Sequence, residues 1–174
     1  IAVVGLGLSA LFPEPRIQPA RTPSTPTAFD PLNATYLIEG KSVILVDGKS
    51  EVESEPGSAT KVITTVFGEP INGDLNGDDN TDAGVILVQN PGGTGTFYYV
   101  TTAIRTNAGA QGTNAIFLGD RIAPQNMQIK DRQLIVSYAD RKPDEPMAAS
   151  PSVGVSKYLV VEGTTLKESA PKTD

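Results

Sequence analysis

The chain of 174 residues contains no cysteine, no histidine and no tryptophan. Without histidine and cysteine it has no Ser-His-Asp triad, no cysteine nucleophile, no zinc site built on nitrogen or sulfur donors, and no disulfide. The composition leaves carboxylate chemistry, a Ser-Lys pair, tyrosine, or a hard cation held by oxygen ligands. The lack of cysteine does not indicate a compartment, because exported and cytosolic chains can both lack it.

Positive charge is also scarce. The 14 Lys and Arg residues are outnumbered by 20 Asp and Glu residues, which gives a net charge of −6. Such a chain has no long-range positive field to attract a phosphate backbone. We therefore expect no nucleic-acid partner, and a surface that attracts cations.

The length and the hydrophobic fraction of 39% are those of one globular domain that needs no cross-links. Residues 1–12 are apolar and uncharged. As a helix they would cover about 18 Å, which is short of the roughly 30 Å hydrocarbon core of a membrane. We predict a remnant of a membrane anchor or signal peptide, or else a segment that packs in the domain or in an assembly.

Residues 13–32 are rich in proline, serine and threonine, which favours an extended linker. Residues 33–166 are predicted to form the domain, and residues 167–174 a polar tail. An apolar end followed by a proline-rich stalk is typical of a tether, so we expect an extracellular or cell-envelope location, anchored to the membrane or secreted.

The domain is predicted to be mainly β. Short segments rich in β-branched and aromatic residues alternate with turn residues, and no window of the domain keeps a helical apolar stripe. The predicted strands are residues 34–39, 42–46, 61–67, 84–88, 95–104, 115–118, 133–138 and 156–161. We predict a small single-domain sandwich or a partly open barrel.

One segment carries a chemical pattern. Oxygen-bearing side chains occupy alternate positions at Asp74, Asn76, Asp78, Asn80 and Asp82. These match positions 1, 3, 5, 7 and 9 of an EF-hand-type calcium loop, in which the seventh residue contributes its backbone carbonyl. The spacing predicts a Ca²⁺ site, against the alternative of a metal-free turn rich in Asx residues.

The match to an EF-hand is incomplete, because Val85 stands where a bidentate Glu is expected and Asp79 where Gly is expected. Strands are also predicted on both sides of the loop. The segment instead resembles the calcium loop of FG-GAP repeats, which lies between strands. That resemblance covers about 30 residues and implies calcium at this loop; a propeller is excluded, because it needs four or more blades.

The order of segments along the domain also resembles a family of uncharacterised bacterial envelope proteins. The segments are NATYLIEGKSV at 33–43, the aspartate loop, GGTGTFYYV at 92–100, LGDRIAP at 118–124, VSYADR at 136–141 and PSVGVS at 151–156. The resemblance implies an exported or singly anchored domain, and it implies no activity.

These observations predict an exported, envelope-tethered, calcium-binding β domain with a binding or structural role. No catalytic residue and no cofactor other than Ca²⁺ is predicted. One alternative is a subunit of an extracellular filament or envelope complex that uses residues 1–31 for assembly, with a protein partner or a second copy. A second is a carbohydrate-active enzyme that uses Asp120 with Asp140 or Asp144, which would require a deep cleft between carboxylates.

Overall fold

The computed structural model describes residues 28–172, and this part of the chain is almost entirely β. A single 3-10 turn, η1, spans Pro31–Asn33. The strands are β1 (Thr35–Ile38), β2 (Lys41–Ile44), β3 (Lys49–Glu53), β4 (Lys61–Val66), β5 (Ile71–Gly73), β6 (Asp82–Asn90), β7 (Phe97–Thr106), β8 (Gly109–Gly112), β9 (Ile116–Asp120), β10 (Ala123–Lys130), β11 (Gln133–Asp140), β12 (Val153–Glu162) and β13 (Thr165–Ser169).

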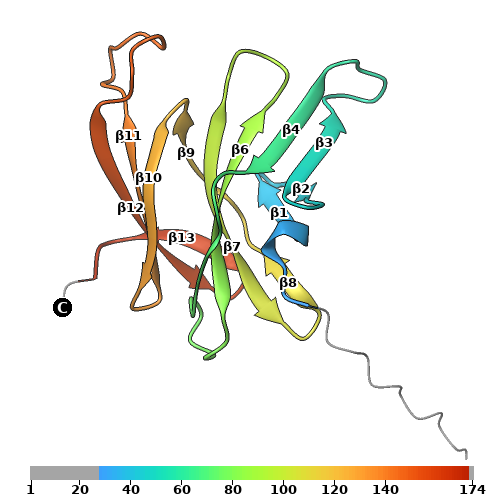
Figure 1. The fold of residues 1–174 in the computed structure, drawn as a ribbon, viewed down its shortest axis with the longest axis vertical. Helices are drawn as coiled ribbons and strands as arrows, with labels where there is room; N and C mark the ends of the chain where they lie inside the picture. The colour runs from blue at the N-terminus through green and yellow to red at the C-terminus, as the bar shows by residue number, and fades with distance from the viewer. Residues whose placement is uncertain (1–27, 173–174) are drawn as a thin grey trace, which may run out of the picture.

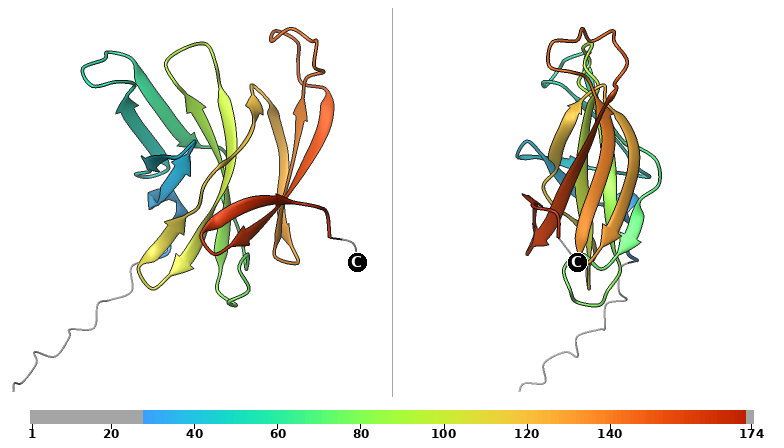
Figure 2. Two further views of the ribbon diagram at one scale, coloured as in Figure 1. Left: turned by 180° about the vertical axis from the view of Figure 1, so that it is seen from behind. Right: turned by 90° about the vertical axis from the view of Figure 1, so that its left-hand side faces the viewer.

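The strands form two larger sheets and one hairpin. The larger sheet has the order β3-β4-β6-β7-β8, with β5 paired to β6 and β9 paired to β7. The second sheet is the meander β10-β11-β12-β13, and β1 pairs with β2 in a two-stranded sheet. Leu37 of β1 also forms a parallel bridge with Asn114. The sheets curl into a half-barrel, with β6 and β7 between β3–β4 on one side and β10–β12 on the other (Figures 1 and 2). The prediction of a mainly β fold is confirmed.

The hairpin of β6 and β7 is buried on both faces. Successive side chains of a strand point to opposite faces, so Val85 and Leu87 enter one hydrophobic cluster while Ile86 enters the other. The first cluster also contains Tyr36 of β1, and the second contains Leu134 of β11. This double burial explains why β6 is an almost continuous apolar run instead of an alternating one.

Each of the predicted strands is present, with shifted ends, but five strands were not predicted. These are β3, β5, β8, β10 and β13, and each is short, polar or rich in glycine. The polar strand β10 alternates between exposed and half-buried residues. Its pairing with β11 along seven positions, and not its composition, makes it a strand.

Ordered structure extends beyond both ends of the predicted domain, residues 33–166. Strand β13 continues to Ser169, three residues into the predicted polar tail, because Leu166 is buried and the strand pairs with β12. At the other end, residues 28–32 of the predicted linker pack on the domain. Asp30 accepts a hydrogen bond from the backbone N–H of Leu32, and the guanidinium of Arg105 lies 4.3 Å from the ring centroid of Phe29.

The predicted apolar segment 1–12 and linker residues 13–27 lie outside the described residues. Among residues 28–172 there is no helix with the length and apolar character needed to cross a membrane.

Candidate metal centre

The aspartate loop connects β5 to β6. Gly73 and Asp82 face each other as the last antiparallel pair, so the intervening residues form the loop of a hairpin. Leu75 anchors this loop, since its side chain is 2% exposed and belongs to the hydrophobic cluster next to the second sheet. The loop is therefore fixed at both ends and at one point in its interior.

Hydrogen bonds from backbone N–H groups to Asp and Asn side chains fold residues 74–80 into successive turns. Asp74 Oδ1 accepts from the N–H of Gly77 at 2.6 Å, and Asn76 Oδ1 accepts from the N–H of Asp78 at 3.0 Å. Asp78 Oδ1 then accepts from the N–H of Asn80 at 2.9 Å. Gly77 has a φ of +86°, a left-handed conformation that glycine adopts without strain.

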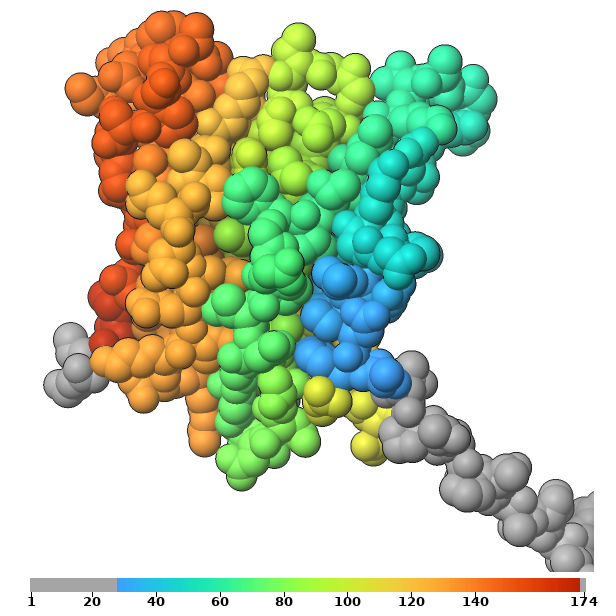
Figure 3. All heavy atoms as spheres, viewed as in Figure 1, coloured from blue at the N-terminus to red at the C-terminus, as the bar shows by residue number. Residues whose placement is uncertain are grey.

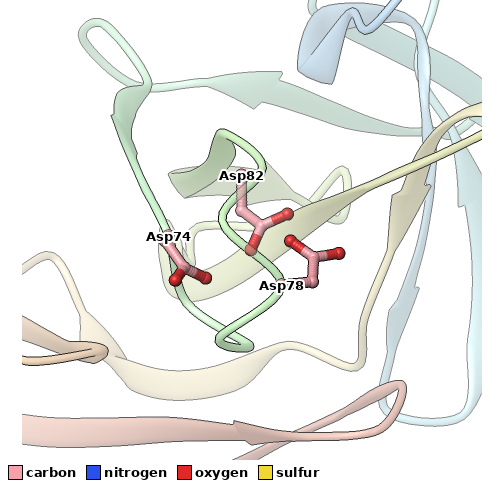
Figure 4. Close-up of side chains that lie close together, drawn as sticks. All are labelled: Asp74, Asp78 and Asp82. Carbon is pink, nitrogen blue, oxygen red and sulfur yellow. The ribbon is translucent and has the colours of Figure 1, made fainter.

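Three carboxylates converge as a result. Asp74, Asp78 and Asp82 each present an oxygen atom within 4.8 Å of the others, and they point toward one another (Figure 4). Two oxygens bound to one Ca²⁺ at 2.3–2.6 Å lie at most about 4.6–5.2 Å apart, whereas the limit for Mg²⁺ at about 2.1 Å is roughly 4.2 Å. The three oxygens are therefore close enough together for one divalent cation to bind them all, and the spacing alone does not select Ca²⁺.

Asp82 is the most constrained of the three. Its side chain is fully buried, and its two oxygens accept hydrogen bonds from the N–H of Leu75 at 3.0 Å and of Arg105 at 2.9 Å. Burial raises the pKa of Asp82, the two N–H donors oppose this effect, and the charges of Asp78 and Asp74 raise the pKa further. A bound cation would relieve the repulsion between these three charges.

Asp78 lies on the solvent side of the loop and is exposed. The N–H of Asn80 and the side chain of Asn76 lower the pKa of Asp78, so its carboxylate stays charged. Asp78 also borders a surface hollow of about 710 Å³ between the loop and the β7–β8 turn. An ion could reach the carboxylates from this hollow with its water ligands.

The five predicted ligand residues thus fall into two groups, three aspartates that converge and two asparagines that bond to Asp78. The structure brings the three aspartates together, while the side chains of Asn76 and Asn80 both bond to Asp78, from Asn76 Nδ2 to Asp78 Oδ2 at 3.1 Å and from Asn80 Nδ2 to the Asp78 carbonyl at 3.5 Å. Calcium itself remains a prediction, since three carboxylates can hold other hard cations.

No pattern in the sequence indicated a role for Arg132, which lies in the turn between β10 and β11. Its Nε is 3.7 Å from Asp74 Oδ2, although its side chain is 60% exposed. The guanidinium also lies over Gly77, where an added Cβ would be 2.7 Å from Nη1. Because more than fifty residues separate the two turns along the chain, only the packing of the second sheet against the loop brings this cation to the aspartates.

The carboxylates considered for glycoside hydrolysis have other contacts. Asp120 accepts from the N–H of Thr96 and lies 3.7 Å from the guanidinium of Arg121, and Asp140 accepts from the N–H of Arg141. Among the described residues, the main surface hollows are lined by residues other than Asp120, Asp140 and Asp144. Catalysis by these carboxylates therefore stays an untested alternative.

No family model matches the chain, and neither a curated protein nor a solved structure matches it. The resemblances to FG-GAP loops and to bacterial envelope proteins therefore stay predictions from sequence.

Proposed function

We propose that this protein is an exported, envelope-tethered β domain that binds one Ca²⁺ at Asp74, Asp78 and Asp82, and that its role is binding or structural. The observation that carries the proposal is the convergence of three carboxylate oxygens within 4.8 Å in a hairpin loop. The ion would neutralise charges that otherwise repel one another, and so hold β5 against β6 and the loop against β7.

An extracellular location, which is itself part of the proposal, favours Ca²⁺ as the cation. Extracellular calcium modules bind at about 10⁻⁴–10⁻³ M, an affinity that a loop with three carboxylates and two exposed asparagines can supply. The N-terminal apolar segment and its proline-rich linker are the grounds for proposing a tether, with the membrane or a protein as the partner.

The experiment is a thermal unfolding series in chelator and with Ca²⁺ or Mg²⁺ titrated to millimolar concentration at constant ionic strength. A ligand at 100 times its dissociation constant stabilises a folded protein by about 2.7 kcal/mol, which raises the midpoint by several degrees for a domain of this size. We expect Ca²⁺ to raise the midpoint and Mg²⁺ to have a much smaller effect.

Two variants identify the site. Asp78→Asn removes a predicted ligand, whereas Asp79→Asn removes the same charge from the next position, outside the group of three. Asp79 has a φ of +62°, which asparagine tolerates, so the control is conformationally matched. If the wild type does not respond to Ca²⁺, or if both variants lose the response equally, the proposed site is wrong.

A second candidate function is assembly through residues 1–31. It is favoured by strands β2 and β3, each of which has one edge without a partner strand among the described residues.

A further inference from the structure

Strands β2 and β3 leave a fork-shaped opening in the fold. They meet at a tight turn, where Val46 and Lys49 exchange two backbone hydrogen bonds of 2.8 and 3.1 Å. Beyond this closed end the strands separate, because β2 pairs with β1 and β3 pairs with β4. Both strands lie at the side of the molecule away from the second sheet (Figure 3).

The main-chain groups along both sides of the fork face into it. On β2, Leu45 donates its backbone N–H to the carbonyl of Ala34, so the N–H and C=O groups of odd-numbered residues point toward β1. The N–H and C=O groups of Ser42 and Ile44 therefore point away from β1, into the fork. On β3, the backbone of Lys49 bonds to that of Val46. By the same alternation, the N–H and C=O groups of Glu51 and Glu53 point away from β4, into the fork. Among the described residues, no strand pairs with either of these edges.

The fork is lined by apolar side chains that the domain leaves in solvent. Ile44 is 63% exposed, Val46 64% and Val52 56%, and the opening between them has a volume of about 450 Å³. Exposed edges that carry aliphatic side chains invite association with another strand, and proteins commonly cover them.

The charged side chains at the fork contact one another. Glu51 lies 2.8 Å from the ammonium of Lys49 and 2.5 Å from that of Lys61, and these contacts lower the pKa of Glu51 to about 2. The carboxylate of Glu51 is therefore already paired, and the exposed aliphatic side chains of the fork favour an apolar strand as its occupant.

We propose that the fork receives the apolar segment 1–12 of a second copy of this chain as an added strand. The segment has no charged residue and opens with Ile-Ala-Val-Val, whose β-branched side chains favour a strand. Strand addition pairs its backbone with the free edges, while alternate side chains contact Ile44, Val46 and Val52.

The connecting chain favours a second copy over the same chain. Residues 13–27 precede the described domain and are rich in proline, and in a fully extended form they would span roughly 45 Å at about 3.1 Å per residue. A domain of this size has a radius of gyration of about 15 Å. A linker extended to that length would place the segment beyond its own domain and within reach of a neighbouring molecule. This inference specifies the assembly alternative and is independent of calcium at the aspartate loop.

The absence of cysteine makes cross-linking a clean test in the full-length chain. Single variants Val4→Cys and Ile44→Cys are mixed under mild oxidation, and the disulfide-linked pairs are identified by mass spectrometry. A disulfide needs Cα atoms closer than about 7 Å, so it forms efficiently only where the segment occupies the fork. The matched control replaces Ile44→Cys by Val153→Cys, an exposed valine on β12 in the other sheet.

We expect roughly tenfold more linkage of position 4 to position 44 than to position 153, owing to the effective concentration of a docked segment. The amides of Ser42, Ile44, Glu51 and Glu53 should also exchange more slowly at high protein concentration. Equal linkage at both positions would overturn the proposal. So would a 4–44 disulfide found only within monomers of the double variant Val4→Cys/Ile44→Cys. So would insertion of the segment into phospholipid vesicles without any linkage, which identifies a membrane anchor. A calcium response in the unfolding series is independent of all these outcomes.

Discussion

The backbone N–H of Arg105 donates to Asp82 Oδ1 at 2.9 Å across 23 residues of sequence, so the last aspartate of the loop is bound to the central strand β7. The other oxygen of Asp82 accepts from the N–H of Leu75 inside the loop. Asp82 therefore has a structural role that does not depend on any ion, whereas the exposed Asp78 contacts only its neighbours in the loop.

This difference predicts effects of different size on the free energy of unfolding for two similar substitutions, both measured in chelator. Asp82→Asn leaves only one oxygen for two N–H donors and turns an amide donor toward the other, so we expect a loss of about 1–3 kcal/mol in the free energy of unfolding. Asp78→Asn removes a repulsive charge at an exposed position and should change it by less than about 0.5 kcal/mol. Urea denaturation measures both, and equal losses would contradict the structural role of Asp82.

Arg132 should weaken cation binding, because its guanidinium lies 3.7 Å from Asp74. Exposed ion pairs contribute about 0.2–1 kcal/mol, so Arg132→Gln should tighten Ca²⁺ binding by roughly 1.5- to 5-fold. The gain should shrink at high ionic strength, where exposed charges are screened. Calorimetric titration of Ca²⁺ at two salt concentrations tests this expectation. An unchanged or weaker affinity in Arg132→Gln would show that Arg132 supports the site.

The tyrosines predict a loss of stability at alkaline pH. Burial raises the pKa of Tyr36 and Tyr138 above the ordinary value, and burial together with the Glu39 contact raises the pKa of Tyr99 to about 12. In the unfolded chain these groups ionise near pH 10. A raised folded pKa contributes stability that is present below about pH 10 and is lost as the pH rises toward 12.

Urea midpoints measured between about pH 8 and pH 11.5, beside the absorbance of tyrosinate, test this expectation. The Tyr99→Phe variant removes one of the three groups, so its midpoint should decline less steeply over the same range. Ionisation of all five tyrosines near pH 10 without unfolding would contradict the assigned burial.

Gly112 marks a close approach of β8 to β1. A Cβ at this position would lie 2.2 Å from the backbone oxygen of Thr35 and 2.6 Å from Cδ1 of Tyr36. We expect Gly112→Ala to destabilise the domain by about 1–3 kcal/mol, because neither backbone nor a buried ring can move aside. Gly154→Ala is the matched control, since nothing lies within 4 Å of its added Cβ. Thermal unfolding of the two variants should differ by several degrees, and a tolerated Gly112→Ala would show that β1 is loosely held.

The strands that the sequence predicted are those whose own residues favour them. Val85, Leu87 and Val100 are β-branched or aliphatic and enter the core directly, so their local pattern and their burial agree. Strand β10 had no such signal, because most of its side chains are polar; its pairing with β11 and the packing of Met127 and Ile129 on the core hold it. Strand β13 extends past the predicted end of the domain for a related reason, since Leu166 is buried and the strand pairs with β12.

By itself, the sequence determined that the domain is mainly β and that oxygen donors gather in residues 74–82, because both depend on residue type and on spacing along a short segment. The tertiary structure decided which of those donors converge, that Asp82 is buried and bound by Arg105, and that Arg132 lies beside Asp74. It also decided that β2 and β3 diverge and leave two free edges. These features depend on contacts between distant strands, and no local pattern specifies which strands meet.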